Sequence, residues 1–196
     1  SGIITHPQSP PVSDGDGLVM AMEVGADLAN MGEAWWGPAS AIPGETYEGR
    51  PMHRQVKERN APHAICVNRY GQRFVNEAAN YNDMAKALFH QDATEGGLRN
   101  QPAWVLFDQQ YRDRYSVLTC RTADPDPDWL PVAATLVGLA QRVGIDPVGL
   151  EPGDIGKGAQ VIQADLDRGL LHRSLRVAAR GAVLAGDRLA RLIEQG

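Results

Sequence analysis

The chain has 196 residues, of which 43% are hydrophobic, 22% charged and 6% aromatic. This composition fits one globular domain and excludes a disordered tail, a collagen-like repeat and a coiled coil. The 19 basic and 24 acidic residues give a formal net charge of −5, so binding of nucleic acid is not expected. The two cysteines are far apart and offer no disulfide framework, so we expect a cytoplasmic protein. No apolar run approaches the length of a membrane span, about 20 residues, so we expect no integral membrane segment.

The first half of the chain predicts one helix, one long connection and one hairpin. After a proline-rich lead-in, apolar residues recur at helical spacing over residues 17–30, and Asp16 can cap the first free amides. Residues 39–59 are rich in glycine, proline and charge, which predicts a connection without regular structure. Residues 63–68 and 73–75 are β-rich and flank a turn that contains Gly71, which predicts a hairpin.

The second half predicts a mixture of helices and a buried strand. Residues 76–90 have a helical pattern, residues 104–107 form a short apolar run typical of a buried strand, and residues 108–115 read as a polar turn or helix. Residues 133–143 predict a helix closed by Gly144, and the Ala/Arg/Leu-rich stretch 174–195 predicts another. The fold class expected from this order is α+β.

Several familiar site patterns fail on inspection. Lys157 is followed by Gly158 instead of the Ser or Thr of a phosphate loop, and Glu151 stands where the first glycine is required. The alternating aspartates of residues 124–128 lack the glycine and the bidentate glutamate of a calcium loop. The five histidines have no metal-ligand spacing. We therefore expect no metal site.

Three features have both a functional and an ordinary interpretation. The segment Gly15-Asp16-Gly17 precedes a helix, where backbone amides can approach a polar or anionic ligand, although glycines there more often form a plain turn. The pair Trp35 and Trp36 can form an aromatic wall for a substrate or pack in a core. Tyr81 follows the predicted hairpin, where a lone tyrosine is usually a packed ring.

Five blocks of the chain together resemble the FAD-dependent fumarate reductase and 3-ketosteroid 1-dehydrogenase family. The resemblance covers about residues 12–150, and its most specific block is Val-Asn-x-x-Gly-x-Arg-Phe-Val-Asn-Glu at residues 67–77. The blocks are residues 14–21, 25–26, 33–38, 62–77 and 102–108. By this resemblance, residues 1–41 would be the tail of the first FAD-binding segment, residues 42–150 the substrate-capping domain, and residues 151–196 a helical segment of unclear origin.

The resemblance also implies roles for single residues. Gly15, Asp16 and Gly17 would lie near the FAD, and the family's proton-transfer group falls on Tyr81, where fumarate reductases have arginine and ketosteroid dehydrogenases have tyrosine. By the same resemblance, Trp35, Trp36 and Asn80 would contact a steroid-like or other apolar ketone. A tyrosine with an ordinary pKa of about 10 is a weak base at neutral pH, so it would need a positive neighbour, a hydrogen-bond donor or another tyrosine to favour the phenolate.

The chain departs from the family in several respects: the family's C-terminal glycine-rich segment is absent, the match fades after about residue 150, and the dinucleotide fingerprint is missing. It lacks the strand, Gly-x-Gly-x-x-Gly and helix that seat a dinucleotide, so FAD is not expected to bind this chain tightly. We therefore expect the capping part of a dehydrogenase that introduces a double bond next to a ketone, inactive alone. The alternatives are a steroid- or lipid-binding module without catalysis, a fragment of a fumarate-reductase-type enzyme, and a fragment with no function of its own.

Overall fold

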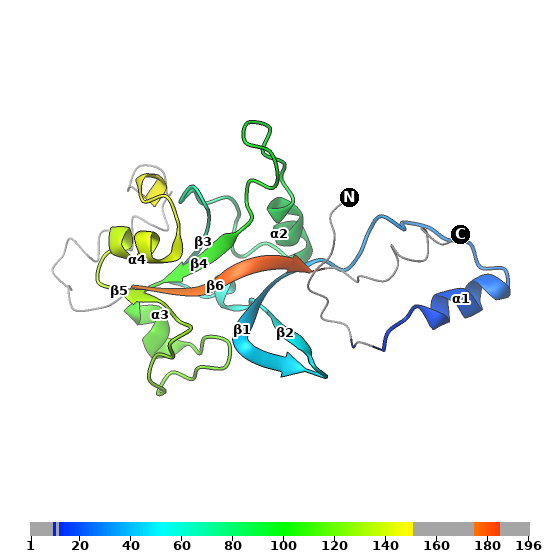
Figure 1. Ribbon diagram of the computed structural model, residues 1–196, viewed down its shortest axis with the longest axis horizontal. Coiled ribbons are helices and arrows are strands. Elements are labelled where there is room, and N and C mark those ends of the chain that lie inside the picture. The colour runs from blue at the N-terminus through cyan, green and yellow to red at the C-terminus, as the bar shows by residue number, and fades with distance from the viewer. Residues whose placement is uncertain (1–9, 11, 151–174, 185–196) are drawn as a thin grey trace.

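One antiparallel sheet organises the chain. The computed structural model describes residues 10, 12–150 and 175–184, and its strands pair in the order β2-β1-β6-β4-β3, with β5 also paired to β6 (Figure 1). The strands are β1 (Gly37–Tyr47), β2 (Arg50–Gln55), β3 (Ala64–Asn68), β4 (Ala103–Phe107), β5 (Val132–Ala133) and β6 (Leu175–Leu184). The helices are α1 (Asp16–Glu23), α2 (Tyr81–Leu88), α3 (Gln109–Arg114) and α4 (Leu136–Val143).

Helices cover both faces of the sheet at strands β3 and β4. Because side chains alternate along a strand, Ile65 and Leu106 point to one face, where they pack against Leu139 of α4. Cys66 and Phe107 point to the other face, where they meet residues of α2 and α3. All five residues of β4 are buried. Its burial on both faces explains why this strand reads as a continuous apolar run.

Side-chain caps fix where three of the helices begin. The oxygens of Asn80, Asp108 and Thr135 accept hydrogen bonds from the backbone N–H groups at the starts of α2, α3 and α4, at 2.9 Å, 2.9 Å and 3.1 Å. Each cap satisfies an amide that the helix itself leaves unpaired. Gly144, at φ 78°, ends α4 in the left-handed region, which confirms the predicted stop.

For residues 60–150, the predicted types of element, helix or strand, agree with the structure. Strands β3 and β4 lie where the β-rich and apolar runs predict them, and α2, α3 and α4 lie within the predicted helical stretches. The predicted hairpin is confirmed only in part, because residues 73–75 contribute a single bridge between Val67 and Arg73. The full partner of β3 is β4, from Ala64 opposite Phe107 to Asn68 opposite Ala103.

Two predictions about regular structure are wrong. Residues 39–59 contain β1, β2 and a 3-10 turn at Glu58–Asn60 instead of an irregular connection. Residues 175–184 form β6 instead of a helix, and this strand lies between β1 and β4. The remainder of the predicted C-terminal helix lies outside the described residues. In β6, pairing with three strands outweighs the helical propensity of an Ala/Arg/Leu-rich stretch.

The first helix lies apart from the sheet (Figure 1). Helix α1 has no buried residue and is shorter than predicted, because Gly25 adopts φ 90° just beyond it. Large apolar side chains are exposed on and after this helix, among them Met20, Met22 and Val24. In the part of the chain that the structure describes, none of the helices is long and apolar enough to cross a membrane. Both cysteines are free thiols in the interior.

Candidate functional site

Tyr81 is the first residue of α2 and is only half-buried. Asn80 caps the helix immediately before it, with its side-chain oxygen 2.9 Å from the backbone nitrogen of Asp83. The Asn80 side-chain nitrogen also donates to the Asp83 carboxylate. These bonds fix the first turn of α2, which carries the tyrosine. The hydrogen bond at the Tyr81 hydroxyl is exposed to solvent, so the hydroxyl is accessible, as a group that acts on an external ligand must be.

Trp35 lies against Tyr81, although the two residues are 46 positions apart in the sequence. The indole N–H of Trp35 donates a hydrogen bond to the Tyr81 hydroxyl oxygen. Their rings stack with centroids 6.3 Å apart and planes inclined by 29°. The structure thus brings together two of the residues that the sequence analysis proposes for the site.

Trp36 has a different environment from Trp35. Its ring meets Phe89 edge-on, with centroids 4.7 Å apart at 79°, and it packs against the small cluster of Ala85, Leu88 and Ala103. Trp35 is 83% exposed, whereas Trp36 is half-buried. The two tryptophans therefore do not form one continuous wall, and only Trp35 contacts the tyrosine.

The 67–77 block forms a tight turn followed by a clamp. The Asn68 side-chain oxygen accepts hydrogen bonds from the backbone N–H groups of Tyr70 and Gln72, at 3.0 Å and 3.1 Å. Gly71 adopts φ 70°, and a Cβ built there would lie 2.7 Å from the Asp146 carbonyl oxygen. Only glycine fits this position without strain, because both the backbone conformation and the neighbouring chain exclude a side chain.

The clamp at the end of this block is the buried carboxylate of Glu77. It accepts a hydrogen bond from the Cys66 backbone N–H at 2.9 Å and pairs with the Arg73 guanidinium, with Nε and Oε1 2.8 Å apart. Strand β3 is an edge strand, so the carboxylate replaces a missing neighbour for one of its amides. Burial and this carboxylate raise the pKa of the Cys66 thiol to about 12. Glu77 therefore has a structural role: it attaches the segment leading to Tyr81 to the sheet.

Arg59 supports the same segment from the other side. Its guanidinium Nη1 donates to the carbonyl oxygens of Glu77 and Ala79, the latter at 2.8 Å, and the residue is only 4% exposed. Burial lowers the pKa of Arg59, while the nearby Cys66 and Glu77 oppose that shift. The backbone immediately before Asn80 is thus fixed at two carbonyls by one buried cation. Sequence reasoning missed Arg59, because nothing in its local pattern indicates burial.

A second polar network holds the far end of α2. Asn68 donates to the Asn100 side-chain oxygen at 3.0 Å, and Asn100 donates to the Ala87 carbonyl oxygen at 2.8 Å. These buried amides connect the end of β3 to the last turn of the helix. Helix α2 is consequently fixed at both ends, which determines where its first residue points.

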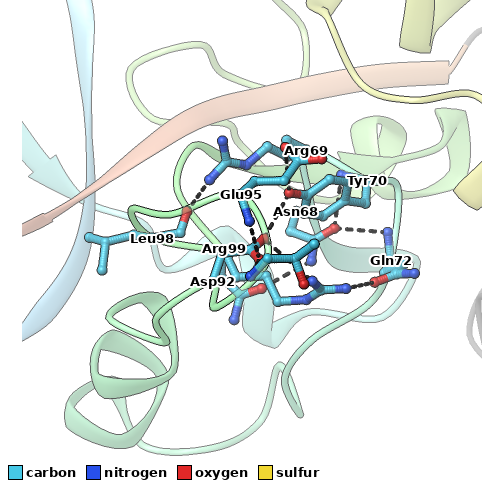
Figure 2. Close-up of polar contacts among 10 residues, drawn as sticks. Asn68, Arg69, Tyr70, Gln72, Asp92, Glu95, Leu98 and Arg99 are labelled. Atoms are coloured by element: carbon cyan, nitrogen blue, oxygen red, sulfur yellow. Dashed lines mark hydrogen bonds and ion pairs between the residues drawn. The ribbon is translucent and has the colours of Figure 1, made fainter.

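The loop after α2 is held by Asp92, which lies between Tyr70 and Arg99 (Figure 2). The Tyr70 hydroxyl donates to the Asp92 carboxylate at 2.8 Å, and the Arg99 guanidinium lies 4.8 Å from the Tyr70 ring centroid. The hydrogen bond from Tyr70 lowers the pKa of Asp92 and raises the pKa of Tyr70. Because Tyr70, Asp92 and Arg99 contact one another, we interpret this network as structural: it stabilises the loop after α2.

The predicted cofactor segment lies on α1, apart from the residues around Tyr81. Gly15 is the N-cap, with φ 84°, and a Cβ on Gly17 would meet nothing within 4 Å. The first turn therefore leaves room for a ligand to approach its amides. The described residues nevertheless contain no strand and glycine-rich turn of the kind that seats a pyrophosphate. They can offer a contact to a flavin, but they do not form its binding site.

The described residues contain no group of three metal-ligating side chains. The acidic loop of residues 124–128, which imitates a calcium loop in the sequence, folds around the buried Arg112. The Arg112 guanidinium contacts the Asp126 carboxylate at 3.1 Å and the Asp124 carbonyl oxygen at 2.7 Å. This loop therefore has a structural role: its oxygens bind the buried guanidinium of Arg112.

Comparisons with known proteins place these features in a family. The family model described as "FAD binding domain" matches residues 5–182. The chain is 47% identical over 138 residues to 4-oxocyclohexanecarboxylate 2-dehydrogenase of Sinomonas cyclohexanicum, covering 70% of this chain and 24% of that protein. It is 37% identical over 139 residues to 3-oxosteroid 1-dehydrogenase of Mycolicibacterium smegmatis, covering 67% of this chain and 23% of that protein.

Solved structures agree with these similarities. The 3-ketosteroid Δ1-dehydrogenase of Sterolibacterium denitrificans, in complex with 1,4-androstadiene-3,17-dione, matches with a TM-score of 0.64 and 25% identity, covering 93% of this chain and 39% of that one. A flavocytochrome c3 fumarate reductase in its open conformation matches with a TM-score of 0.56 and 17% identity, covering 92% and 30%. The chain spans about a quarter of the length of the curated relatives it matches.

Proposed function

Because the chain belongs to the family of FAD-binding domains and is a mixed α/β part of a fumarate-reductase-like flavoprotein, we propose that it is the substrate-capping part of a dehydrogenase. The reaction would introduce a double bond next to the carbonyl of a cyclic ketone. Residues 42–150 would form the cap, and residues 1–41 would belong to the FAD-binding part. The family uses FAD, and the substrate would be a steroid-like or other apolar ketone.

The observation that carries this proposal is the accessible hydroxyl of Tyr81 at the start of α2, hydrogen-bonded by Trp35. A tyrosine is suited to exchange a proton with an uncharged substrate. An arginine, which stays protonated, is better suited to a dicarboxylate. The residue type therefore favours a ketone as the substrate.

The chemistry assigned to this chain is proton transfer. A carbonyl acidifies the neighbouring C–H bonds, and formation of the double bond removes one proton and one hydride from adjacent carbons. Tyr81 would exchange the proton through its hydroxyl oxygen, while Trp35 and Asn80 would border the space in front of it. Since the described residues do not form a flavin site, acceptance of the hydride lies outside what they can do.

Strand β6 also bears on the extent of the cap. It pairs with β1 over Gly37–Ala39 and with β4 over Ala103–Phe107. The last segment of the cap would therefore come from residues 175–184, in addition to residues 42–150. This placement supports a cap that is completed by a strand from late in the chain.

A chimeric enzyme tests the proposal. Residues 12–150 of this chain would replace the matching segment of 4-oxocyclohexanecarboxylate 2-dehydrogenase, which supplies the remaining flavin-binding parts. We expect the chimera to contain FAD and to oxidise a cyclic ketone with an artificial electron acceptor. The variant Tyr81→Phe should reduce kcat by at least about a hundredfold, the lower range for an acid-base group, whereas Tyr47→Phe, at an exposed tyrosine in β1, should not.

Assaying a carboxylated cyclohexanone and a 3-oxosteroid in parallel would identify the ketone class. A folded, FAD-loaded chimera in which Tyr81→Phe retains full activity would contradict the assigned role of Tyr81. Calorimetric titration of the whole chain with an apolar ketone addresses the binding-module alternative. Because a cap without its flavin-binding part should bind poorly, tight binding by the chain alone would favour a stand-alone module.

A further inference from the structure

We infer that Trp35 is a positioning residue for Tyr81: its indole N–H fixes the direction in which the Tyr81 hydroxyl hydrogen points. This inference deepens the proposed function and rests on it for its catalytic meaning. The hydrogen bond itself is a property of the chain and can be tested without any reaction.

The argument begins with the chemistry of the two groups. The indole nitrogen of tryptophan can donate a hydrogen bond but cannot accept one, whereas the tyrosine hydroxyl can do both. In the contact between them, Trp35 is therefore the donor and the Tyr81 oxygen the acceptor. One lone pair of that oxygen is occupied, and the hydroxyl hydrogen cannot point back toward the indole. Within the described part of the chain, no other residue is bonded to this hydroxyl.

The segment that carries Trp35 is held along α2 at further points. Glu33 pairs with Lys86 of α2, with Oε2 and Nζ 3.0 Å apart, and Trp36 packs against Phe89 just beyond the helix. The ion pair is exposed and contributes little stability by itself. Together with the contact to Tyr81, these interactions align residues 33–36 with the whole length of the helix. The indole is thus held beside the phenol instead of meeting it by chance at a surface.

The exposure of Trp35 indicates that its main contribution is not to the stability of the fold. Its side chain buries little surface against this chain, since it is 83% exposed, so packing of its ring contributes little to folding. What it does provide is a directed donor and a stacked ring beside one hydroxyl. A tyrosine whose hydrogen points outward is oriented to donate it to a ligand in front of the cap, and to take a proton back along the same direction.

The first test uses the full 196-residue chain with 15N-labelled indole groups. The sequence has four tryptophans, and Trp35→Phe identifies one resonance by its loss while keeping an aromatic ring to stack. We expect Tyr81→Phe to move that resonance upfield and to leave the other three in place. Trp129→Phe, at a tryptophan packed near α3, is the matched control and should not alter the Trp35 signal. An unmoved Trp35 resonance in Tyr81→Phe would overturn the inference.

The second test uses the chimeric enzyme of the preceding section. Trp35→Phe should lower kcat roughly three- to tenfold, the effect of losing one ordinary hydrogen bond, with little change in KM for the ketone. A merely structural tryptophan would instead alter stability and leave kcat in place, and that result would overturn the inference. If the chimera with the native segment has no activity, the proposed function fails, and the indole resonances still decide whether Trp35 fixes the hydroxyl.

Discussion

The carboxylate of Glu77 provides the sharpest test of how the segment before Tyr81 is held. Glu77→Ala removes the acceptor of the Cys66 backbone N–H, which lies on a residue only 1% exposed. A buried amide left without a partner costs about 1–3 kcal/mol. The ion pair with Arg73 adds about 1 kcal/mol, because the Arg73 side chain is 31% exposed and solvent screens it.

We therefore expect Glu77→Ala to lower the free energy of unfolding by about 2–4 kcal/mol, a large part of the stability of an ordinary domain. Urea unfolding followed by tryptophan fluorescence measures this change. Glu77→Gln keeps an oxygen that can accept the amide, so it should cost only about 1 kcal/mol. Arg73→Ala removes the ion pair alone and should also cost about 1 kcal/mol.

The order of these variants is what tests the reasoning. If Arg73→Ala destabilises the chain as much as Glu77→Ala, the ion pair dominates and the edge amide does not need the carboxylate. If Glu77→Ala lies within about 0.5 kcal/mol of the native chain, as for an unimportant surface change, the clamp does not hold this segment at all.

Three further predictions follow from features of the interior and of the cofactor segment. Gly71→Ala should lower the free energy of unfolding in urea by about 3 kcal/mol or more, because it combines a left-handed backbone with a blocked side-chain position. Gly97 is also left-handed, at φ 73°, but has open space around it, so Gly97→Ala should cost only about 1 kcal/mol. Equal losses in the two variants would show that the close approach to Asp146 is unimportant. Burial raises the pKa of the Cys66 thiol from 9.0 to about 12. The thiol therefore ionises first in the unfolded chain, and the free energy of unfolding should fall as the pH rises from 9.0 to about 12, a decline that Cys66→Ala should reduce. A pH profile of stability that this variant leaves unchanged would contradict the raised pKa of Cys66. The purified 196-residue chain should be colourless, because its described residues do not form a dinucleotide site, and a stoichiometric yellow flavin band in its absorption spectrum would contradict this prediction.

The sequence predicts the parts of the fold in which local pattern and tertiary environment agree. The apolar run of β4 is buried on both faces, so its composition and its structure match. Strand β1 contains Pro43 and Gly44, which indicate a loop, yet the strand pairs on both sides of a register shift there. The Ala/Arg/Leu composition of β6 favours a helix until its neighbouring strands are considered.

The same distinction applies to the candidate site. The resemblance to the family points to Tyr81, because the family's proton-transfer group follows the 67–77 block at a fixed distance. The contact of Tyr81 with Trp35 joins residues 46 positions apart and has no local signal. Arg59 was missed because its importance comes from burial against two carbonyls and not from its neighbours in sequence. The roles assigned to all the site residues remain predictions: Tyr81, Gly15, Asp16, Gly17, Trp35, Trp36 and Asn80.

The position of β6 has a consequence for how the protein is made. During synthesis, the first two strands and the β3–β4 pair emerge well before residues 175–184, and in the described sheet only that late strand joins them. Contacts between such distant positions slow assembly, because a long stretch of polypeptide must close before any of them forms. A nascent chain on the ribosome would therefore hold these two strand pairs without the strand that lies between them, with unpaired edges open to chaperones, until residues 175–184 are translated.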